Sequence, residues 1–520
     1  MKQTFRNCAL GLALLTALPA STLAQDTPRV ETAAPHHETS RQEQPRARSE
    51  RKGGILDLLP PDSVSEHTLS VDGGTLAYTA TAGTLDLYDQ SGQRSAAVFY
   101  TSYVARDRSG KPHSDRPMTF VFNGGPGAAS AFLHLGLVGP RRLDFGPTER
   151  DGAHAKLVDN PQSWLAFTDL VLIDPIGTGW SRTAKADDAK NFYGVRQDAQ
   201  AIAKVIALYL SHHGRTGTPT YLLGESYGGF RAAKVASALS DQQGIIVSGI
   251  VMLSPLIDGA LTFGGNRLAL GAALQLPSLA AAELERRNAF SLKDLQAAER
   301  FALTDYLTTL AGPAPSGPEA DAFYRRVADI TGLPLDVIRK RRGFIRDAYV
   351  KHLRGSDHAL VSHYDITLAA PDPSPDSDGA HSDDPVLDGF VRAYGGAFAD
   401  YARNELGFKT EMTYTLLADG VNGRWDWGAG GRAMASVTDD LRQLLAINPA
   451  LRVMIANGYS DLVTPYAASK YIVDHLPPTL TDRVTFKVYR GGHMLYTHAP
   501  SREAFTADAK AFYTQGAEKK

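Results

Sequence analysis

A serine enclosed by glycines stands out in this chain because a serine hydroxyl can act as a nucleophile. The segment GESYGG at residues 224–229 directly follows the apolar run TYLL at 220–223 and directly precedes a helix-like segment at 230–236. A strand, a sharp turn and a helix in this order would expose the hydroxyl of Ser226 at the strand end. Only small residues fit at the flanking positions 224 and 228, where backbone comes close. A hydroxyl needs a positioned base to become reactive, so a histidine and a carboxylate should accompany it.

Two further loops supply a carboxylate and an imidazole. The loop at 457–461 follows a strand-like run and ends at Asp461, and the loop at 491–494 follows another strand-like run and contains His493. Serine, acid and histidine in this chain order are typical of one group of catalytic triads. The simpler interpretation is that Asp461 and His493 only stabilise their own turns. It does not explain why three strands end in such loops, and we predict a triad of Ser226, Asp461 and His493.

A glycine-rich turn could stabilise the negative charge that forms during acyl transfer. The segment NGGPG at 123–127 follows a strand-like run at 118–122. Backbone NH groups exposed by such a turn can bind an oxyanion, and we expect the NH groups of Gly125 and Tyr227 to do so. A phosphate-binding loop is the alternative. It requires a lysine followed by serine or threonine, which this segment lacks.

Together these motifs resemble those of the serine carboxypeptidases, a family with the α/β-hydrolase fold. The similar segments are FNGGPG at 122–127, NPQSW at 160–164, DPIGTGWS at 174–181, GESYGG at 224–229, NGYSDLVTP at 457–465 and GHM at 492–494. The resemblance extends in the family's order from about Met118 to Phe512. It implies a hydrolase that releases C-terminal residues from peptides through an acyl-enzyme. It also implies that Asn123 and Glu225 bind the terminal carboxylate of the substrate.

The chain departs from the family pattern beside the predicted carboxylate site. The family usually has a second glutamate where this chain has Leu137, so the expected pair of carboxyl groups is missing. Arg141 and Arg142 follow directly, and a guanidinium can bind a carboxylate through two hydrogen bonds. Such arginines are more often solvated at the surface. Ala128 stands where many relatives have a disulfide cysteine.

The N-terminal segment indicates export. Residues 1–24 combine basic residues, an apolar stretch at 9–20 and the small-residue sequence TLA before Gln25, which is typical of a secretory signal peptide. No later apolar run has the length of about 18 residues that a membrane span needs. The single cysteine, Cys8, lies within the signal and lacks a lipoprotein-like context. We expect a bacterial protein, periplasmic or secreted, without a membrane anchor.

The remaining chain reads as one catalytic domain with an insertion. Residues 25–54 are rich in polar residues and proline and predict a disordered linker. Hairpin-like runs then lead into strands that alternate with helices, which is typical of a mostly parallel sheet covered on both faces. We predict an α/β-hydrolase fold built from residues 55–260 and 421–520. The helical segment 261–420 is expected to form an inserted cap.

Charge and composition restrict the partners. The balance of 54 basic against 56 acidic residues argues against nucleic acid and favours small or peptidic substrates; with the family resemblance, we expect peptides. No cofactor or metal is expected. The pair His36-His37 lacks further ligands, and the acidic loop at 374–385 has serine and proline where a calcium loop needs Asp and Glu. The aromatic segment 421–427 could contact substrate or pack in the core. Oligomeric state stays open.

Two other functions fit the same motifs less closely. An esterase or an acyltransferase would use the same triad, and some members of the family transfer acyl groups. A non-catalytic binding protein on this fold is the alternative from a different class.

Overall fold

A computed structural model describes residues 54–71, 73–107, 109–113, 115–146, 154–379 and 384–517. Residues Gly53–Lys520 form one compact unit. The predicted signal peptide 1–24 lies outside the described residues, as does the predicted linker 25–54 except for its last residue. No helix among the described residues has both the length and the apolar character needed to cross a bilayer.

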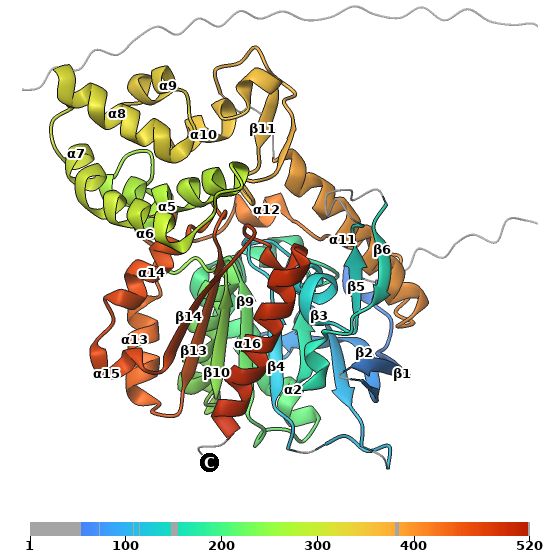
Figure 1. Cartoon of the computed structure of the whole chain (residues 1–520). Helices are drawn as coiled ribbons and strands as arrows, with labels where there is room; N and C mark the ends of the chain where they lie inside the picture. The colour runs from blue at the N-terminus through green and yellow to red at the C-terminus, as the bar shows by residue number, and fades with distance from the viewer. Residues whose placement is uncertain are drawn as a thin grey trace, which may run out of the picture. The chain divides into compact units, whose positions relative to one another are not determined.

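A ten-stranded sheet forms the centre of this unit (Figure 1). Its strand order is β1-β2-β3-β7-β4-β9-β10-β13-β14, with β8 paired to β3. The strands are β1 (Ser63–Val71), β2 (Gly74–Tyr88), β3 (Arg94–Ala105), β4 (Met118–Phe122), β7 (Asp169–Ile173), β8 (Arg182–Thr183), β9 (Thr220–Glu225), β10 (Gly249–Leu253), β13 (Arg452–Gly458) and β14 (Val484–Tyr489). All neighbours from β7 to β14 pair in parallel, whereas β1, β2 and β3 form antiparallel hairpins and β3 pairs antiparallel with β7. The predicted mostly parallel sheet is confirmed.

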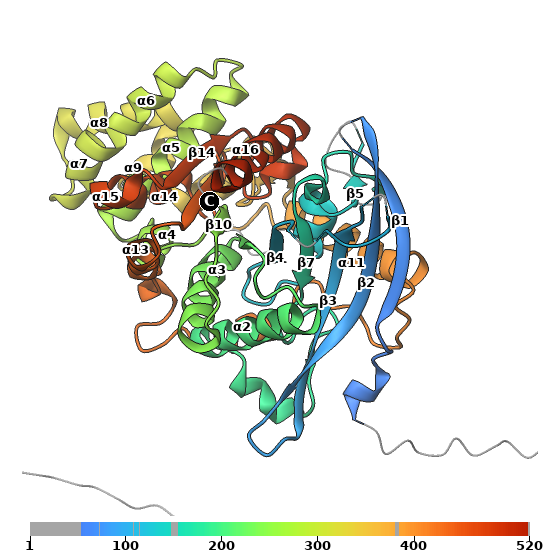
Figure 2. The same ribbon diagram turned by 90° about the horizontal axis from the view of Figure 1, so that it is seen from below.

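Helices cover both faces of this sheet. In β9, Leu222 packs on one face with helices α2 (Val195–His212), α3 (Tyr227–Ala238) and α13 (Thr438–Ile447). Tyr221 and Leu223 pack on the other face with α16 (Ala499–Ala517). Figure 2 shows α2 and α3 on one side of the sheet and α16 on the other. Because side chains alternate along a strand, nearly continuous apolar strands fill two cores at once.

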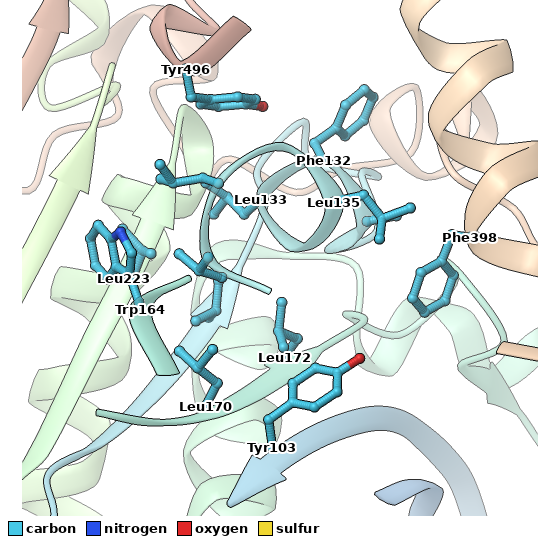
Figure 3. Close-up of a cluster of buried hydrophobic side chains, with 14 of the residues drawn as sticks. Tyr103, Phe132, Leu133, Leu135, Trp164, Leu170, Leu172, Leu223, Phe398 and Tyr496 are labelled. Atoms are coloured by element: carbon cyan, nitrogen blue, oxygen red, sulfur yellow. The ribbon is translucent and has the colours of Figure 1, made fainter. Parts of the chain in front are cut away.

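The chain between β10 and α13 adds two different helical parts. The helices of this region are α4 (Gly259–Phe263), α5 (Ala269–Arg286), α6 (Leu292–Phe301), α7 (Leu307–Ala311), α8 (Gly317–Thr331), α9 (Leu335–Lys340), α10 (Arg346–His352), α11 (Pro385–Asn404) and α12 (Asp419–Asn422). Helices α5, α8 and α10 share an apolar core of their own, which includes Leu462. In contrast, Phe398 of α11 belongs to the same sheet core as Tyr103 (Figure 3). The predicted cap 261–420 therefore contains one helix that belongs structurally to the hydrolase core.

The remaining elements are short. Two small antiparallel sheets pair β5 (Arg141–Asp144) with β6 (Lys156–Asp159) and β11 (Ala359–Val361) with β12 (Ala369–Pro371). Helices α1 (Ala131–Leu133), α14 (Tyr466–Asp474) and α15 (Pro478–Thr481) complete the α-helices. Single 3-10 or π-helical turns are η1 (Ile55–Leu58), η2 (His134–Val138), η3 (Trp164–Ala166), η4 (Ala186–Asn191), η5 (Leu239–Gln243), η6 (Ala302–Tyr306), η7 (Gly355–Asp357), η8 (Arg432–Met434) and η9 (Leu495–Thr497).

The strand order creates a crevice at the ends of β4 and β9. After β4 the chain adds β7 on one side of it and then β9 on the other side. Open α/β sheets bind ligands where the strand order reverses in this way, outside the carboxyl ends of the strands. The turn at 123–127 follows β4 and Ser226 follows β9, so the fold brings both to this crevice.

Close backbone packing explains the glycines around Ser226. Ser226 has φ 63° and ψ −126°, a conformation that non-glycine residues rarely adopt. A Cβ atom at Gly224 would overlap the carbonyl group of Gly228. A Cβ atom at Gly228 would lie 2.6 Å from the carbonyl oxygen of Phe122, at the end of the neighbouring strand. The prediction that only small residues fit at 224 and 228 is confirmed.

Replacing Gly224 by alanine should destabilise the protein. The added methyl group meets backbone that cannot move without displacing Ser226, so we expect a loss of at least about 2 kcal/mol of unfolding free energy. Gly396→Ala is the matched control, because a Cβ atom at this helical position of α11 meets nothing within 4 Å. It should leave stability unchanged or raise it by up to about 1 kcal/mol. Urea denaturation measures both, and equal effects would contradict the packing argument.

Candidate active site

The three residues of the predicted triad end three strands of the sheet. Ser226 follows β9, Asp461 lies beyond β13, and His493 lies beyond β14. Asp461 and His493 are buried, while Ser226 is partly exposed. Ser226 and His493 line one cavity of about 290 Å³, together with Asn123, Glu225 and other residues. The fold thus collects the sequence-predicted side chains at one site.

A short hydrogen bond joins His493 to Asp461. The His493 Nδ1 atom lies 2.8 Å from Asp461 Oδ2. Asp461 Oδ1 accepts hydrogen bonds from the backbone NH groups of Val463 at 2.8 Å and Thr464 at 2.9 Å. An ionised carboxylate can only accept, so Nδ1 of His493 carries the hydrogen and Nε2 remains free to act as a base. Asp461 therefore fixes both the orientation and the tautomer of the ring.

The surroundings adjust the basicity of His493. Burial alone would lower the pKa of its imidazole, but the nearby charge and hydrogen bond of Asp461 and the charge of Glu225 raise the pKa above its ordinary value. A raised pKa means that the imidazolium form is stabilised when the ring takes up a proton. This is the property required of a base that receives the proton of Ser226.

The two expected oxyanion donors lie on adjoining loops. A Cβ atom at Gly124 would lie 2.5 Å from the backbone nitrogen of Tyr227, so the turn at 123–127 packs directly on the nucleophile turn. Within the described residues, neither the Gly125 NH nor the Tyr227 NH donates to a protein acceptor. The Ser226 NH, in contrast, is bonded to the Leu253 carbonyl at 2.9 Å. Two unpaired NH groups beside Ser226 suit an oxyanion.

A buried ion pair that no motif in the sequence marks holds these two loops together. Arg231 of α3 and Asp198 of α2 form a salt bridge of 2.6 Å, with the Arg231 side chain fully buried. The same guanidinium donates a hydrogen bond to the carbonyl of Asn123 and lies 5.0 Å from the ring centre of Tyr227. Arg231 thereby ties the turn after β4 to the helix that begins with Tyr227.

Asn123 and Glu225 form a hydrogen-bonded pair in the cavity wall. Asn123 Nδ2 donates to Glu225 Oε2 at 2.7 Å, while Asn123 Oδ1 accepts from the Leu133 NH at 3.1 Å. The Tyr496 hydroxyl donates to Glu225 Oε2 at 3.0 Å. Burial raises the pKa of Glu225 to about 7, although His493, Tyr496 and Asn123 each favour the ionised form. Glu225 therefore gains or loses its proton near neutral pH.

Tyr496 lies next to Glu225 and bonds to it, whereas Leu137, which stands where the family usually has a second glutamate, does not. Leu137 lies in the η2 turn, is fully buried among apolar side chains and does not line the cavity. The Tyr496 ring packs directly on the adjoining Gly136, where a Cβ atom would overlap it. Only its position three residues after His493 could have marked Tyr496 in the sequence. Figure 3 shows the tyrosine above Leu133 and level with Phe132, on the side away from the sheet.

Several other candidates lie away from the cavity. Arg141 forms ion pairs with Asp159 at 2.5 Å and Glu405 at 3.0 Å, and neither it nor Arg142 lines the cavity. Trp425 and Trp427 pack edge-on against the Tyr227 ring, at 5.4 and 5.3 Å between ring centres. The two tryptophans of the segment 421–427 thus pack against the nucleophile turn without lining the cavity.

No metal site occurs in the part of the chain that the structure describes, where no group of three or more His, Cys, Asp or Glu side chains could hold a metal ion. In the acidic loop, Asp378 pairs with Lys340 at 3.4 Å. His36 and His37 lie outside the described residues.

Comparisons with known proteins agree with the resemblance seen in the motifs. Residues 76–266 match the family model of the serine carboxypeptidases. A search of curated proteins found no match. Among solved structures, Kex1Δp, a prohormone-processing carboxypeptidase from Saccharomyces cerevisiae, is 16% identical over 84% of this chain and 92% of its own, with a TM-score of 0.53.

Two further structures are more distant. Proline iminopeptidase from Mycobacterium smegmatis is 15% identical over 87% of this chain and 98% of its own, with a TM-score of 0.34. A soluble variant of monoglyceride lipase from Saccharomyces cerevisiae is 11% identical over 83% and 96%, with a TM-score of 0.39. The Kex1Δp similarity shows the α/β-hydrolase fold. The family match over residues 76–266 supports a hydrolase of the serine carboxypeptidase type.

Replacing Tyr496 by phenylalanine should shift a pH profile upward. The tyrosine hydroxyl favours the ionised form of Glu225, so its loss raises the pKa of Glu225 further. The measured quantity is kcat/KM for a blocked dipeptide divided by kcat/KM for its C-terminal amide. Both substrates depend on His493 in the same way, so this dependence cancels in the ratio and the effect of Glu225 remains. This ratio should fall as pH rises through about 7 in the wild type, and at a higher pH in Tyr496→Phe.

Tyr394→Phe provides the control for this experiment. Tyr394 is a buried tyrosine whose hydroxyl also lies beside Gly136, but no hydrogen bond joins it to Glu225 in the described structure. The midpoint of its ratio should equal that of the wild type. A downward shift in Tyr496→Phe, or equal shifts in both variants, would contradict the assigned role of Tyr496.

Proposed function

We propose that this chain is an exported serine carboxypeptidase that removes single residues from the C-termini of peptides through an acyl-enzyme. The observation that carries the proposal is the buried carboxyl group of Glu225 beside Ser226, held by Asn123 and Tyr496 and raised in pKa to about 7. An esterase has no need for such a group. A peptidase specific for chain ends needs one, because it must bind a carboxylate next to the scissile bond.

In the proposed first half-reaction, Ser226 attacks the last peptide bond. His493 Nε2 takes the hydroxyl proton while Oγ bonds to the carbonyl carbon, and Asp461 stabilises the imidazolium that forms. The NH groups of Gly125 and Tyr227 stabilise the oxyanion. The carbon–nitrogen bond then breaks, and the imidazolium passes its proton to the amine of the departing residue.

In the second half-reaction, water releases the acyl group. His493 takes a proton from the water as its oxygen attacks the ester carbon, and the same two NH groups again hold the oxyanion. The bond to Ser226 Oγ breaks and the oxygen regains a proton from His493. The shortened peptide leaves with a new carboxylate, and the enzyme returns to its starting state.

Recognition of the chain end would rest on Glu225 and Asn123. A protonated Glu225 can donate a hydrogen bond to the substrate carboxylate, whereas an ionised Glu225 would repel it. Asn123 Nδ2 uses one of its two hydrogens for Glu225, which leaves the other for the substrate. Because Oδ1 is occupied by the Leu133 NH, the amide cannot flip. The pair thus presents two donors to a carboxylate.

Export and location are supported by the sequence of residues 1–24 alone. Their basic start, apolar stretch and small-residue end are those of a signal peptide. We propose a periplasmic or secreted enzyme on this basis, acting on peptides without a cofactor.

Asn123→Ala should impair hydrolysis of blocked dipeptides far more than hydrolysis of the matching amides. It removes the hydrogen that would bind a substrate carboxylate, together with the hydrogen bond that holds Glu225, and we expect a selective loss of about tenfold or more in kcat/KM for the free acids. Ser226→Ala is the control, since it should reduce turnover of both substrates by several orders of magnitude. Equal losses for both substrates in Asn123→Ala would remove the carboxylate role. Turnover of esters and amides without any preference for free acids would favour an esterase or acyltransferase.

A further inference from the structure

An unpaired arginine, Arg432, faces the same cavity on the other side of Ser226 from Asn123. Arg432 lines the cavity with Ser226, Glu225 and His493, and its side chain is exposed. Among the residues that the structure describes, no carboxylate forms an ion pair with it. Neither the triad nor the proposed terminal carboxylate site uses this charge.

Two aromatic rings hold the guanidinium in place. Its central carbon lies 4.0 Å from the ring centre of Phe263 and 5.7 Å from that of Trp427. A guanidinium on an aromatic face keeps the NH groups at its edge available for hydrogen bonds. The group is therefore oriented in advance for a planar anion such as a carboxylate, which it can bind through two hydrogen bonds.

The sheet places Arg432 on the acyl side of the nucleophile. Arg432 is anchored beside α4, beyond the end of β10, because a Cβ atom at Gly259 would overlap its carbonyl group. Asn123 lies beyond the end of β4. Since β9 runs between β4 and β10, Ser226 lies between these two anchor points. If Asn123 and Glu225 hold the last residue, Arg432 lies toward the residue before it.

The two sides of the cavity also carry opposite charges, with Asp419 on the side of the β4 turn and Arg432 on the other side. Asp419 also lines the cavity and follows Ala418, whose NH donates to the Gly127 carbonyl at 2.8 Å. Asp419 thus belongs to the side of the cavity that the β4 turn forms, where the last residue would bind. An acidic side chain is unfavourable on that side and favourable beside Arg432.

We propose that Arg432 selects substrates with an acidic side chain in the penultimate position, the residue whose carbonyl group Ser226 attacks. The inference rests on the proposed function for the direction of the substrate. It goes beyond it by naming glutamyl and aspartyl acyl groups as the preferred class. Arg432 acts here as a specificity residue that contacts the substrate side chain.

The test compares glutamate with glutamine in blocked dipeptides. The substrates are blocked Glu-Ala and Gln-Ala, blocked Ala-Glu and Ala-Gln, and the blocked α-ethyl esters of Glu and Gln. The measured quantity is the ratio of kcat/KM for the Glu compound to that for its Gln partner. The wild type should favour Glu-Ala over Gln-Ala by about tenfold. It should show no preference for Ala-Glu over Ala-Gln.

Three variants separate a docked guanidinium from a general charge effect. Arg432→Gln should bring the Glu-Ala to Gln-Ala ratio to about one, and Arg432→Lys should retain part of it because lysine keeps the charge without the planar fork. Arg346→Gln is the matched control. Arg346 does not line the cavity and bonds to the Leu462 carbonyl at 3.2 Å, so its loss should change the ratio less than about twofold.

The esters distinguish failure of this inference from failure of the proposed function. Suppose that blocked peptides are not cleaved, but that the Glu ester is preferred over the Gln ester and this preference depends on Arg432. The proposed carboxypeptidase function would then be refuted, whereas the role of Arg432 in specificity would be supported. A wild-type ratio near one, a ratio unchanged in Arg432→Gln, or an Arg432-dependent preference for Ala-Glu would overturn the inference. Absence of turnover for peptides and esters alike would overturn both.

Discussion

The site depends on direct backbone packing between the turn after β4 and the turn after β9. Glycines at 124 and 228 allow this approach, since a Cβ atom at either would overlap backbone of the other turn or its strand, and Gly224 allows the nucleophile turn to fold back on Gly228. The approach sets the Tyr227 backbone against Gly124, next to Gly125, and holds Ser226 in a conformation that serine rarely adopts. Arg231 adds a polar tie between the same two turns, with its charge balanced by Asp198. Strain at one residue is thus supported by packing and by a buried ion pair around it.

A second constraint is electrostatic and couples Glu225 to His493. Each group favours the charged form of the other, because a glutamate anion stabilises an imidazolium. Peptide cleavage in the proposed mechanism needs the opposite arrangement, with Glu225 protonated and His493 neutral. Both arrangements hold the same number of protons, so their balance does not depend directly on pH. A substrate carboxylate beside Glu225 would favour the protonated carboxyl group and thereby the active arrangement.

Local sequence was sufficient where a motif and its structural context lie together. Ser226, Asp461 and His493 could be found because each follows a strand and lies in a recognisable turn. Tyr496 could not be assigned, because its partner Glu225 lies 271 positions away and only the fold joins them. The same holds for Arg432, whose aromatic partners come from α4 and the segment after α12. The sequence predicted that the segment 261–420 is helical, but not that its helix α11 packs on the sheet core.

Departures from a family pattern were the weakest ground for inference. Leu137 indicates that Glu225 lacks the family's second glutamate, and Arg141 or Arg142 could bind a carboxylate instead, although such arginines are more often solvated at the surface. In the structure, Arg141 is engaged in surface ion pairs, and a tyrosine from another loop bonds to Glu225. A lost side chain can thus be replaced from anywhere in the fold, which a single sequence does not reveal.

The central claim is that Glu225 and its partners make the cavity a receptor for a free chain end. The most direct measurement is mass spectrometry of a mixed peptide pool incubated with the purified protein, with half of each peptide amidated at its C-terminus. The account predicts ladders that lose one residue at a time from free-acid peptides, while the amidated copies lag far behind. Internal cleavage, release from the N-terminus, or equal shortening of both forms would contradict it.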